Sequence, residues 1–214
     1  MKPISKIWLR ARLSVRDLIA DSSGIAAIEF AMIVPIMLLM FFGTLEFSSG
    51  VAVDRKVTLI ARTLSDLTSQ QVTSVADTEL TNFFTASISI LTPYDATPTK
   101  ARISEIYVDS HQVATIQWSK AATIASGATQ ATLTTSTRFA GDVVTGLVPP
   151  ALLVKQTSLI FSEVSYLYKP TVGYKMAPAG VNLSDVAFSR PRQSACVIYN
   201  PTAAPGTTTP CPSS

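Results

Sequence analysis

The chain has 214 residues, of which 47% are hydrophobic and 14% are charged, with a formal net charge of +3 at pH 7. Residues 1–24 hold five basic and two acidic side chains, so the rest of the chain has 12 of each. A nucleic-acid-binding domain spreads Lys and Arg over its folded surface, so this distribution argues against that partner and favours one membrane segment followed by one ordinary domain.

The first predicted element is a basic leader over residues 1–24. Its basic side chains precede a long apolar stretch, and this asymmetry predicts a cytoplasmic N-terminus. The leader does not have the form of an ordinary secretory signal peptide, because the small residues of "DSSG", ending at Gly24, stand before the apolar stretch rather than after it. A cut after Gly24 would therefore remove the leader and leave the hydrophobic helix on the mature protein.

The second element is a membrane-spanning helix over residues 25–48. The apolar stretch 25–45 is about 31 Å long as a helix, which matches a hydrocarbon core of about 30 Å. Backbone polar groups in lipid must bond within the segment, so a helix is expected. Pro35 lies inside it and should bend it or loosen one turn. Residues after about 50 are then expected on the far side of the membrane.

Residues 49–95 are predicted to extend this helix and to add a second one. Five apolar side chains recur at three- and four-residue steps, which indicates one continuous helix over 25–69: Val53, Val57, Ile60, Leu64 and Leu67. The stretch 74–91 predicts a shorter helix with one apolar face, formed by Leu80, Phe83, Phe84 and Ile88. Two prolines then break the helical pattern over 91–99.

Residues 96–200 carry strand patterns, which predict an α+β fold: a long N-terminal helix followed by a small domain with an antiparallel sheet. The stretch 101–121 predicts a hairpin with its turn near 109–111. The stretch 157–170 predicts the best strand, with Ile160, Val164, Tyr166 and Tyr168 on one face and Leu159, Phe161 and Leu167 on the other. Two shorter strands are expected at 184–191 and 195–200, and a short helical turn within 137–150.

The tail, residues 201–214, is rich in Pro, Thr and Ser and is expected to be irregular. Cys196 and Cys211 are the two cysteines of the chain. A cysteine pair in a domain beyond a membrane favours an oxidising compartment and one disulfide; two free thiols are the alternative. The bond would contribute on the order of 3 kcal/mol by the chain-entropy account.

Glu29 is an anomaly in the predicted span. A charge inside a membrane helix costs roughly 2.5–3.5 kcal/mol on insertion scales. If the chain is cut after Gly24, however, Ile25 carries a free amino group, and Glu29 lies one helical turn further in. Pairing of this carboxylate with the amine of a neighbouring helix would remove much of that cost and favour the assembled state.

The stretch from Gly24 to Phe30, "GIAAIEF", resembles the processing site of type IV pilin-like proteins. Across about 45 residues the chain is similar to the TadE/TadG-type proteins, minor pseudopilins of the Tad/Flp tight-adherence pilus. The positions that match their pattern are Gly24, Glu29, Phe30, Pro35, Gly43 and Glu46. The resemblance implies a bacterial inner-membrane protein with a periplasmic domain. It also implies cleavage by a prepilin peptidase, with Gly24, Ile25, Glu29 and Phe30 as the processing site.

The resemblance further implies a structural role in surface adherence, with Glu29 and Ile25 in subunit assembly. The implied partners are other pilins or pseudopilins and the Tad inner-membrane assembly machinery. Major Flp pilins are much shorter and usually carry Tyr after the glutamate, so Phe30 and the large domain favour a minor component. TadG-type proteins are often long, with a von Willebrand-like domain. The length of this chain favours a TadE-like or TadF-like protein.

Two other classes of function compete with this interpretation. The first is an uncleaved, membrane-anchored periplasmic adaptor that binds a partner through its sheet domain. The second is a tethered hydrolase that uses His111, the only histidine. No G-x-S-x-G elbow, Cys/His metal cluster or nucleotide-binding loop accompanies it, so we expect a protein that is not an enzyme and has no cofactor or metal.

Overall fold

The computed structural model describes residues 23–72, 74–170, 179–200 and 211. Residues 1–22 of the predicted leader and most of the predicted tail therefore lie outside the described residues. The chain divides into two compact units, Met1–Phe47 and Ser48–Ser214. Each unit is described by itself.

The first unit consists, in its described part, of the beginning of helix α2 (Ser23–Ser69), which continues through Pro35 without interruption. Large apolar side chains are exposed along it from Ile25 to Phe47. Among the described helices, α2 alone is long and apolar enough to cross a membrane. The continuous helix predicted over residues 25–69 is confirmed.

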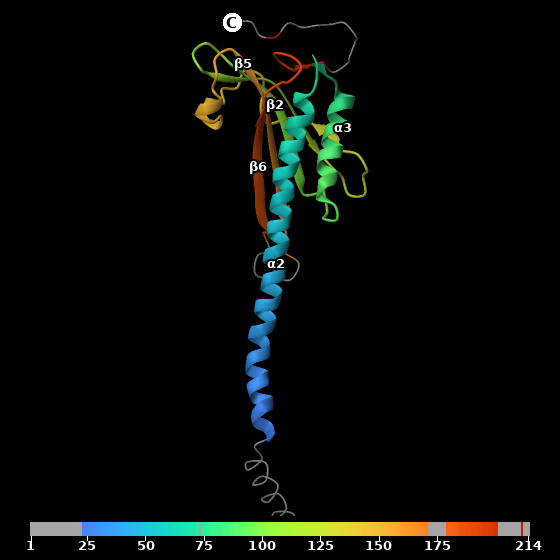
Figure 1. The fold of residues 1–214 in the computed structure, drawn as a ribbon. Helices are drawn as coiled ribbons and strands as arrows, with labels where there is room; N and C mark the ends of the chain where they lie inside the picture. The colour runs from blue at the N-terminus through green and yellow to red at the C-terminus, as the bar shows by residue number, and fades with distance from the viewer. Residues whose placement is uncertain (1–22, 73, 171–178, 201–210, 212–214) are drawn as a thin grey trace, which may run out of the picture. The chain divides into compact units, whose positions relative to one another are not determined.

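The second unit contains a five-stranded antiparallel sheet in the order β4-β3-β2-β5-β6 (Figure 1). The strands are β2 (Thr99–Val108), β3 (Ala114–Thr123), β4 (Thr132–Thr134), β5 (Thr157–Tyr168) and β6 (Val181–Ser189). The predicted hairpin is the pair β2–β3, and the predicted best strand is β5. The α+β class with an antiparallel sheet is thus confirmed.

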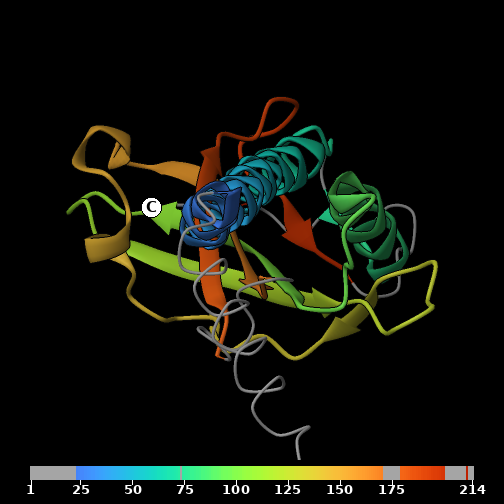
Figure 2. The same ribbon diagram turned by 90° about the horizontal axis from the view of Figure 1, so that it is seen from below.

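One face of this sheet is covered by the end of α2 and by helix α3 (Asp77–Ile88), which lie side by side (Figure 2). Most of the predicted apolar side chains of both helices meet the sheet here: Val53, Val57, Ile60, Leu64, Leu80, Phe84 and Ile88 are all fully buried. The predicted Leu67 and Phe83 are only partly buried. The hydroxyl of Ser162 on β5 donates to the carbonyl of Ala61 at 2.6 Å, so helix and strand are also joined by a buried hydrogen bond.

The other face of the sheet has a smaller core. Leu159 and Phe161 on β5 pack there with Val144 and Val148 from the connection between β4 and β5. This connection contains two short 3₁₀ turns, η2 (Thr145–Leu147) and η3 (Pro150–Leu152), close to the predicted helical turn. The alternation predicted for β5 is confirmed, since Ile160, Val164 and Tyr166 belong to the helix-side core.

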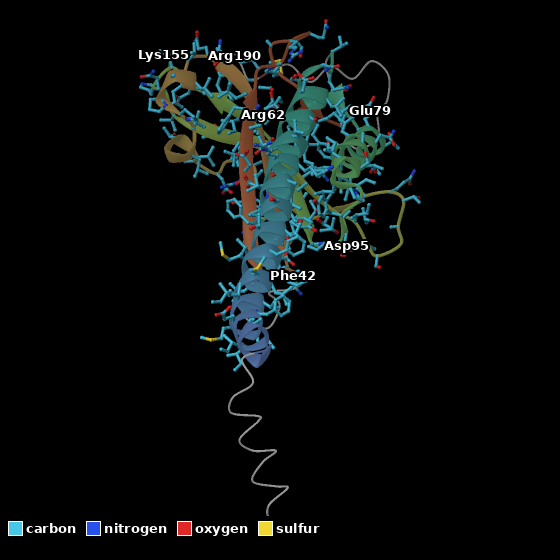
Figure 3. The ribbon with its side chains drawn as sticks, turned by 60° about the horizontal axis from the view of Figure 1, so that its bottom comes forward. Phe42, Arg62, Glu79, Asp95, Lys155 and Arg190 are labelled. Atoms are coloured by element: carbon cyan, nitrogen blue, oxygen red, sulfur yellow. A yellow bond between two sulfur atoms is a disulfide. The ribbon has the colours of Figure 1, made fainter. Side chains whose placement is uncertain are left out.

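Two predicted boundaries differ from the structure around α3. The helix begins at Asp77, because Ser74–Val75 form strand β1, which pairs in parallel with β7 (Ile198–Tyr199). The carboxylate of Glu79 accepts the N–H of Ala76 at 2.9 Å and so caps the first turn (Figure 3). After Ile88 the chain tightens into the 3₁₀ turn η1 (Ser89–Leu91).

The strand predictions near the C-terminus also need correction. The strand expected at 195–200 is only β7, and it pairs with β1 rather than with the main sheet. Strand β6 begins at Val181, three residues before the predicted start, because its pairing with β5 extends as far as Tyr168. The short strand β4 was not predicted, since three residues of sequence Thr-Leu-Thr carry too little periodic signal.

Candidate functional site

The predicted processing residues all lie in the first turns of α2. Ile25 and Phe30 are 56% and 69% exposed, and Glu29 is exposed as well. A Cβ built on Gly24 would meet no atom within 4 Å, and the φ angle of Gly24 lies outside the left-handed region. The described fold therefore has no steric or backbone reason for a glycine at this position.

Glu29 has no counter-charge close to it in its own helix. It lies four residues after Ile25, on the same helical face. Within the described part of the chain it makes no hydrogen bond or ion pair. The sequence contains no Lys or Arg between Arg16 and Arg55, so the nearest cationic side chains lie several turns away.

The surface around Glu29 is apolar on all sides of the helix. Phe42 belongs to this exposed stretch (Figure 3) and makes an edge-to-face contact with Phe41, with the ring centroids 5.4 Å apart. A Cβ on Gly43 would also meet no atom within 4 Å. A helix that is hydrophobic all round needs lipid or other helices to cover it.

The C-terminal cysteines form the predicted disulfide. Cys196 and Cys211 are bonded, with their Cα atoms 5.7 Å apart, and Cys196 is buried. Neighbouring Val197 is fully buried in the helix-side core. The bond therefore joins the tail to a residue that is fixed in the domain.

Glu105 is a buried acidic side chain that the sequence interpretation missed. It is 2% exposed and accepts hydrogen bonds from the backbone N–H of Val197 and the indole N–H of Trp118, each at 3.0 Å. Burial raises the pKa of Glu105 to about 7, although these bonds act in the opposite direction. The alternation of β2 could have indicated that Glu105 is buried, because it follows Ala101 and Ile103 at two-residue steps on the buried face of the strand.

Glu163 joins two arginines on the opposite face of the sheet. It accepts one hydrogen bond from Arg102 at 2.8 Å and two from Arg138 at 2.6 Å. Burial alone raises the pKa of Glu163, but the hydrogen bond from Arg138 and the charges of both arginines outweigh it and hold the pKa below its usual value. Arg138 lies in a loop, so no sequence pattern pointed to this cluster.

His111 lies exposed in the turn between β2 and β3. Its Nδ1 is 3.3 Å from the hydroxyl of Ser110. The turn itself is built by Asp109, whose carboxylate accepts the N–H groups of His111 and Val113 at 2.8 Å. In the described residues, no group of three or more His, Cys, Asp or Glu side chains is placed to hold a metal ion.

The comparisons with known proteins bear on the N-terminal helix. The family model described as TadE-like protein matches residues 24–64. No curated protein and no solved structure matched the chain. The family match begins at Gly24 and covers the exposed apolar part of α2 and much of its buried continuation. Residues 24–64 are therefore similar to TadE-like proteins, as the resemblance predicted.

Proposed function

We propose that the protein is a TadE-like minor pseudopilin, a structural or assembly component of a Tad-type pilus for surface adherence. A prepilin peptidase cuts the precursor after Gly24. Residues 25–48 then anchor the mature chain in the bacterial inner membrane, with the N-terminus on the cytoplasmic side. The observation that carries this proposal is the TadE-like match, which begins at Gly24 in an apolar helix with an exposed surface.

The surroundings of Gly24 support the processing step. Glycine inside a helix costs about 1 kcal/mol relative to alanine, and the described fold gives no compensating contact or backbone conformation at Gly24. If a glycine is required at position 24, the requirement therefore comes from a protein that binds this segment and not from the fold of the chain itself. A peptidase that must bring its reacting groups close to the backbone supplies such a requirement, because any Cβ would stand in the way.

The surroundings of Glu29 support a role in assembly. Its side chain lies in an apolar stretch with no basic side chain within several turns of the same helix, so its partner must come from elsewhere. After cleavage, the free amine of Ile25 on a neighbouring subunit is such a group, at nearly the same depth in a parallel bundle. Each subunit would then offer one amine and one carboxylate, so the pairing can be repeated along an assembly.

Two observations support a periplasmic domain. Positive charge is concentrated in residues 1–24, before the span. The disulfide between Cys196 and Cys211 is typical of an oxidising compartment. The other pilins or pseudopilins and the Tad assembly machinery are the proposed partners of this membrane-anchored form.

The test is the intact mass of the protein extracted from membranes without reductant, from cells with and without an active prepilin peptidase. We expect the mass of Ile25–Ser214 less two hydrogens when the peptidase is active, and the full-length mass when it is not. A full-length mass in both strains would contradict the proposal and favour the uncleaved periplasmic adaptor. Gly24→Ala should block processing, whereas Gly43→Ala, also unobstructed in the same helix, should not.

A further inference from the structure

The outer edge of β3 has a gap in its pairing. Ala121–Thr123 pair with β4, and at the other end Ile116 donates to the carbonyl of Asp142 at 2.9 Å and accepts from Gly141 at 2.8 Å. Between these two paired regions, residues 117–120 line a cleft of about 590 Å³ together with residues 133–136 and 138–140. Clefts of this size are typical of sites for small ligands.

The floor of this edge cleft contains a β-bulge. Glu105 pairs with Trp118 and Ile106 pairs with Ile116, so Gln117 is an extra residue on β3. Bulges are common beside binding sites, because they turn a side chain away from the regular alternation of a strand. Gln117 thus lines the cleft. Its amide nitrogen donates weakly to Thr115, with distances of 3.4 and 3.5 Å, and its amide oxygen can accept hydrogen bonds from a ligand.

One wall of the cleft is held by a set of aromatic and charged contacts. The hydroxyl of Tyr199 donates to Asp77 at 2.8 Å, and the ammonium of Lys120 lies 4.3 Å from the centre of the Tyr199 ring. Trp118 packs beside Tyr199, with the ring centroids 5.9 Å apart. These contacts fix the wall before any ligand arrives.

The opposite wall displays an aromatic ring at the surface. Phe139 is 61% exposed, yet its loop is fixed, because its N–H donates to the carboxylate of Asp142 at 2.7 Å. The neighbouring hydroxyl of Ser136 lies 2.7 Å from that of Ser119 on β3, which joins the loop to the strand. An exposed phenylalanine on an ordered loop is available for stacking.

The charges of the cleft are compensated internally. Arg138 is hydrogen-bonded to Glu163, and the ammonium of Lys120 lies 3.9 Å from Asp77. An anionic ligand would have to compete with these carboxylates. What the cleft offers instead is hydroxyl and amide groups next to an exposed aromatic face, and these complement a ligand with many hydroxyls and an apolar ring face.

We propose that the edge cleft binds a neutral saccharide. A pyranose ring with equatorial hydroxyls presents a flat C–H face, which stacks on Phe139, while its hydroxyls bond to Gln117 and to the exposed side chain of Thr135, which also lines the cleft. The periplasmic or surface-exposed domain would then have a ligand-binding activity of its own. This activity does not depend on cleavage after Gly24 or on pairing through Glu29.

The test is a titration of the full chain in lipid nanodiscs, since detergents with sugar headgroups would compete. The probes are cellotriose and N,N′,N″-triacetylchitotriose, which are neutral, and trigalacturonate, which is anionic. Saturation-transfer NMR should show binding of at least one neutral trisaccharide. Phe139→Ala should weaken that binding roughly three- to tenfold, the range expected for loss of one aromatic stacking contact, and Gln117→Ala should weaken it as well.

The matched control is Leu147→Ala, which removes another half-exposed apolar side chain outside the cleft and should leave binding unchanged. All variants should keep the wild-type melting temperature within about a degree, so a change in binding cannot be assigned to unfolding. The proposal would be overturned if neither neutral probe bound, if trigalacturonate alone bound, or if Phe139→Ala and Gln117→Ala both bound as the wild type does.

Discussion

Glu105 and Val197, which are 92 positions apart, are joined by a buried hydrogen bond of 3.0 Å from the backbone N–H of Val197 to the carboxylate. The carbonyl of Val197 in turn accepts the indole N–H of Trp118 at 2.6 Å. Both polar groups of one buried residue are thus held by two side chains of the sheet. These two hydrogen bonds of Val197 fix the C-terminal segment to the core.

The burial of Glu105 makes the stability of the domain depend on pH. The folded-state pKa of Glu105 is about 7, above the ordinary value of 4.5. A carboxyl with a raised pKa binds its proton more tightly when folded, so the free energy of unfolding is highest below about pH 4.5 and falls as the pH rises to about 7. The full difference is about 3 kcal/mol. Urea unfolding between pH 5 and 8 measures it.

The matched variant for this measurement is Glu105→Gln. It should be less stable than the wild type at pH 5, because the amide cannot accept both hydrogen bonds equally well, and it should lose most of the pH dependence. Glu163 does not interfere, since its pKa lies below the usual value and it stays ionised over this range. An unchanged pH slope in Glu105→Gln would assign the dependence to another group.

Loss of the disulfide should destabilise the domain. The bond closes a loop with a sequence separation of 15, so Cys211→Ser should lower the free energy of unfolding by about 3 kcal/mol. Denaturant unfolding with and without dithiothreitol measures this effect. Reductant should destabilise the wild type by a similar amount and leave Cys211→Ser unaffected; equal responses of the two proteins would contradict the prediction.

The two phenylalanines Phe84 and Phe139 should respond in opposite ways to truncation. Phe84 on α3 is fully buried between the helices and the sheet, so Phe84→Ala should cost about 3–5 kcal/mol of unfolding free energy. Phe139 is largely exposed, and Phe139→Ala should change stability by less than about 0.5 kcal/mol. Thermal or urea unfolding of the two variants gives this comparison directly.

Removal of the membrane carboxylate should impair assembly without affecting the domain. We expect Glu29→Gln to give much less crosslinked oligomer among the cleaved chains, because the amide cannot form an ion pair with the amine of a neighbouring subunit. Crosslinking in membranes, followed by gel analysis, measures the effect. Asp54→Asn, which removes an exposed charge further along the same helix, is the control and should crosslink as the wild type does.

How much of the fold the sequence predicts depends on the length of each pattern. Helix α2 and strand β5 carry regular periods over many residues, so their extents and buried faces could be predicted. The pairing of Ser74–Val75 with Ile198–Tyr199 could not, because two residues have no period and their partner lies more than a hundred positions away. The start of α3 was misplaced for the same reason, since β1 occupies the residues before it.

The functional residues likewise differ in how far the sequence alone predicts them. Gly24, Ile25, Glu29 and Phe30 are close in sequence and form one local motif, so the sequence alone is enough to propose them as a site. The cluster around Glu163 requires the register that sets Arg102 opposite it, as well as a loop that returns Arg138 to the same face. The edge cleft likewise depends on where β4 stops pairing with β3, which no local pattern specifies.

The attachment of Val197 has a consequence for the order of events during biogenesis. Residues 25–48 are synthesised long before the residues that complete the domain. The core cannot be completed at that stage, because Glu105 lacks its hydrogen bond from the backbone of Val197 and Cys196 has no partner until residue 211 follows. Completion of the core is therefore coupled to the synthesis of residues 197–211, and a chain stalled before them would have an unfinished domain.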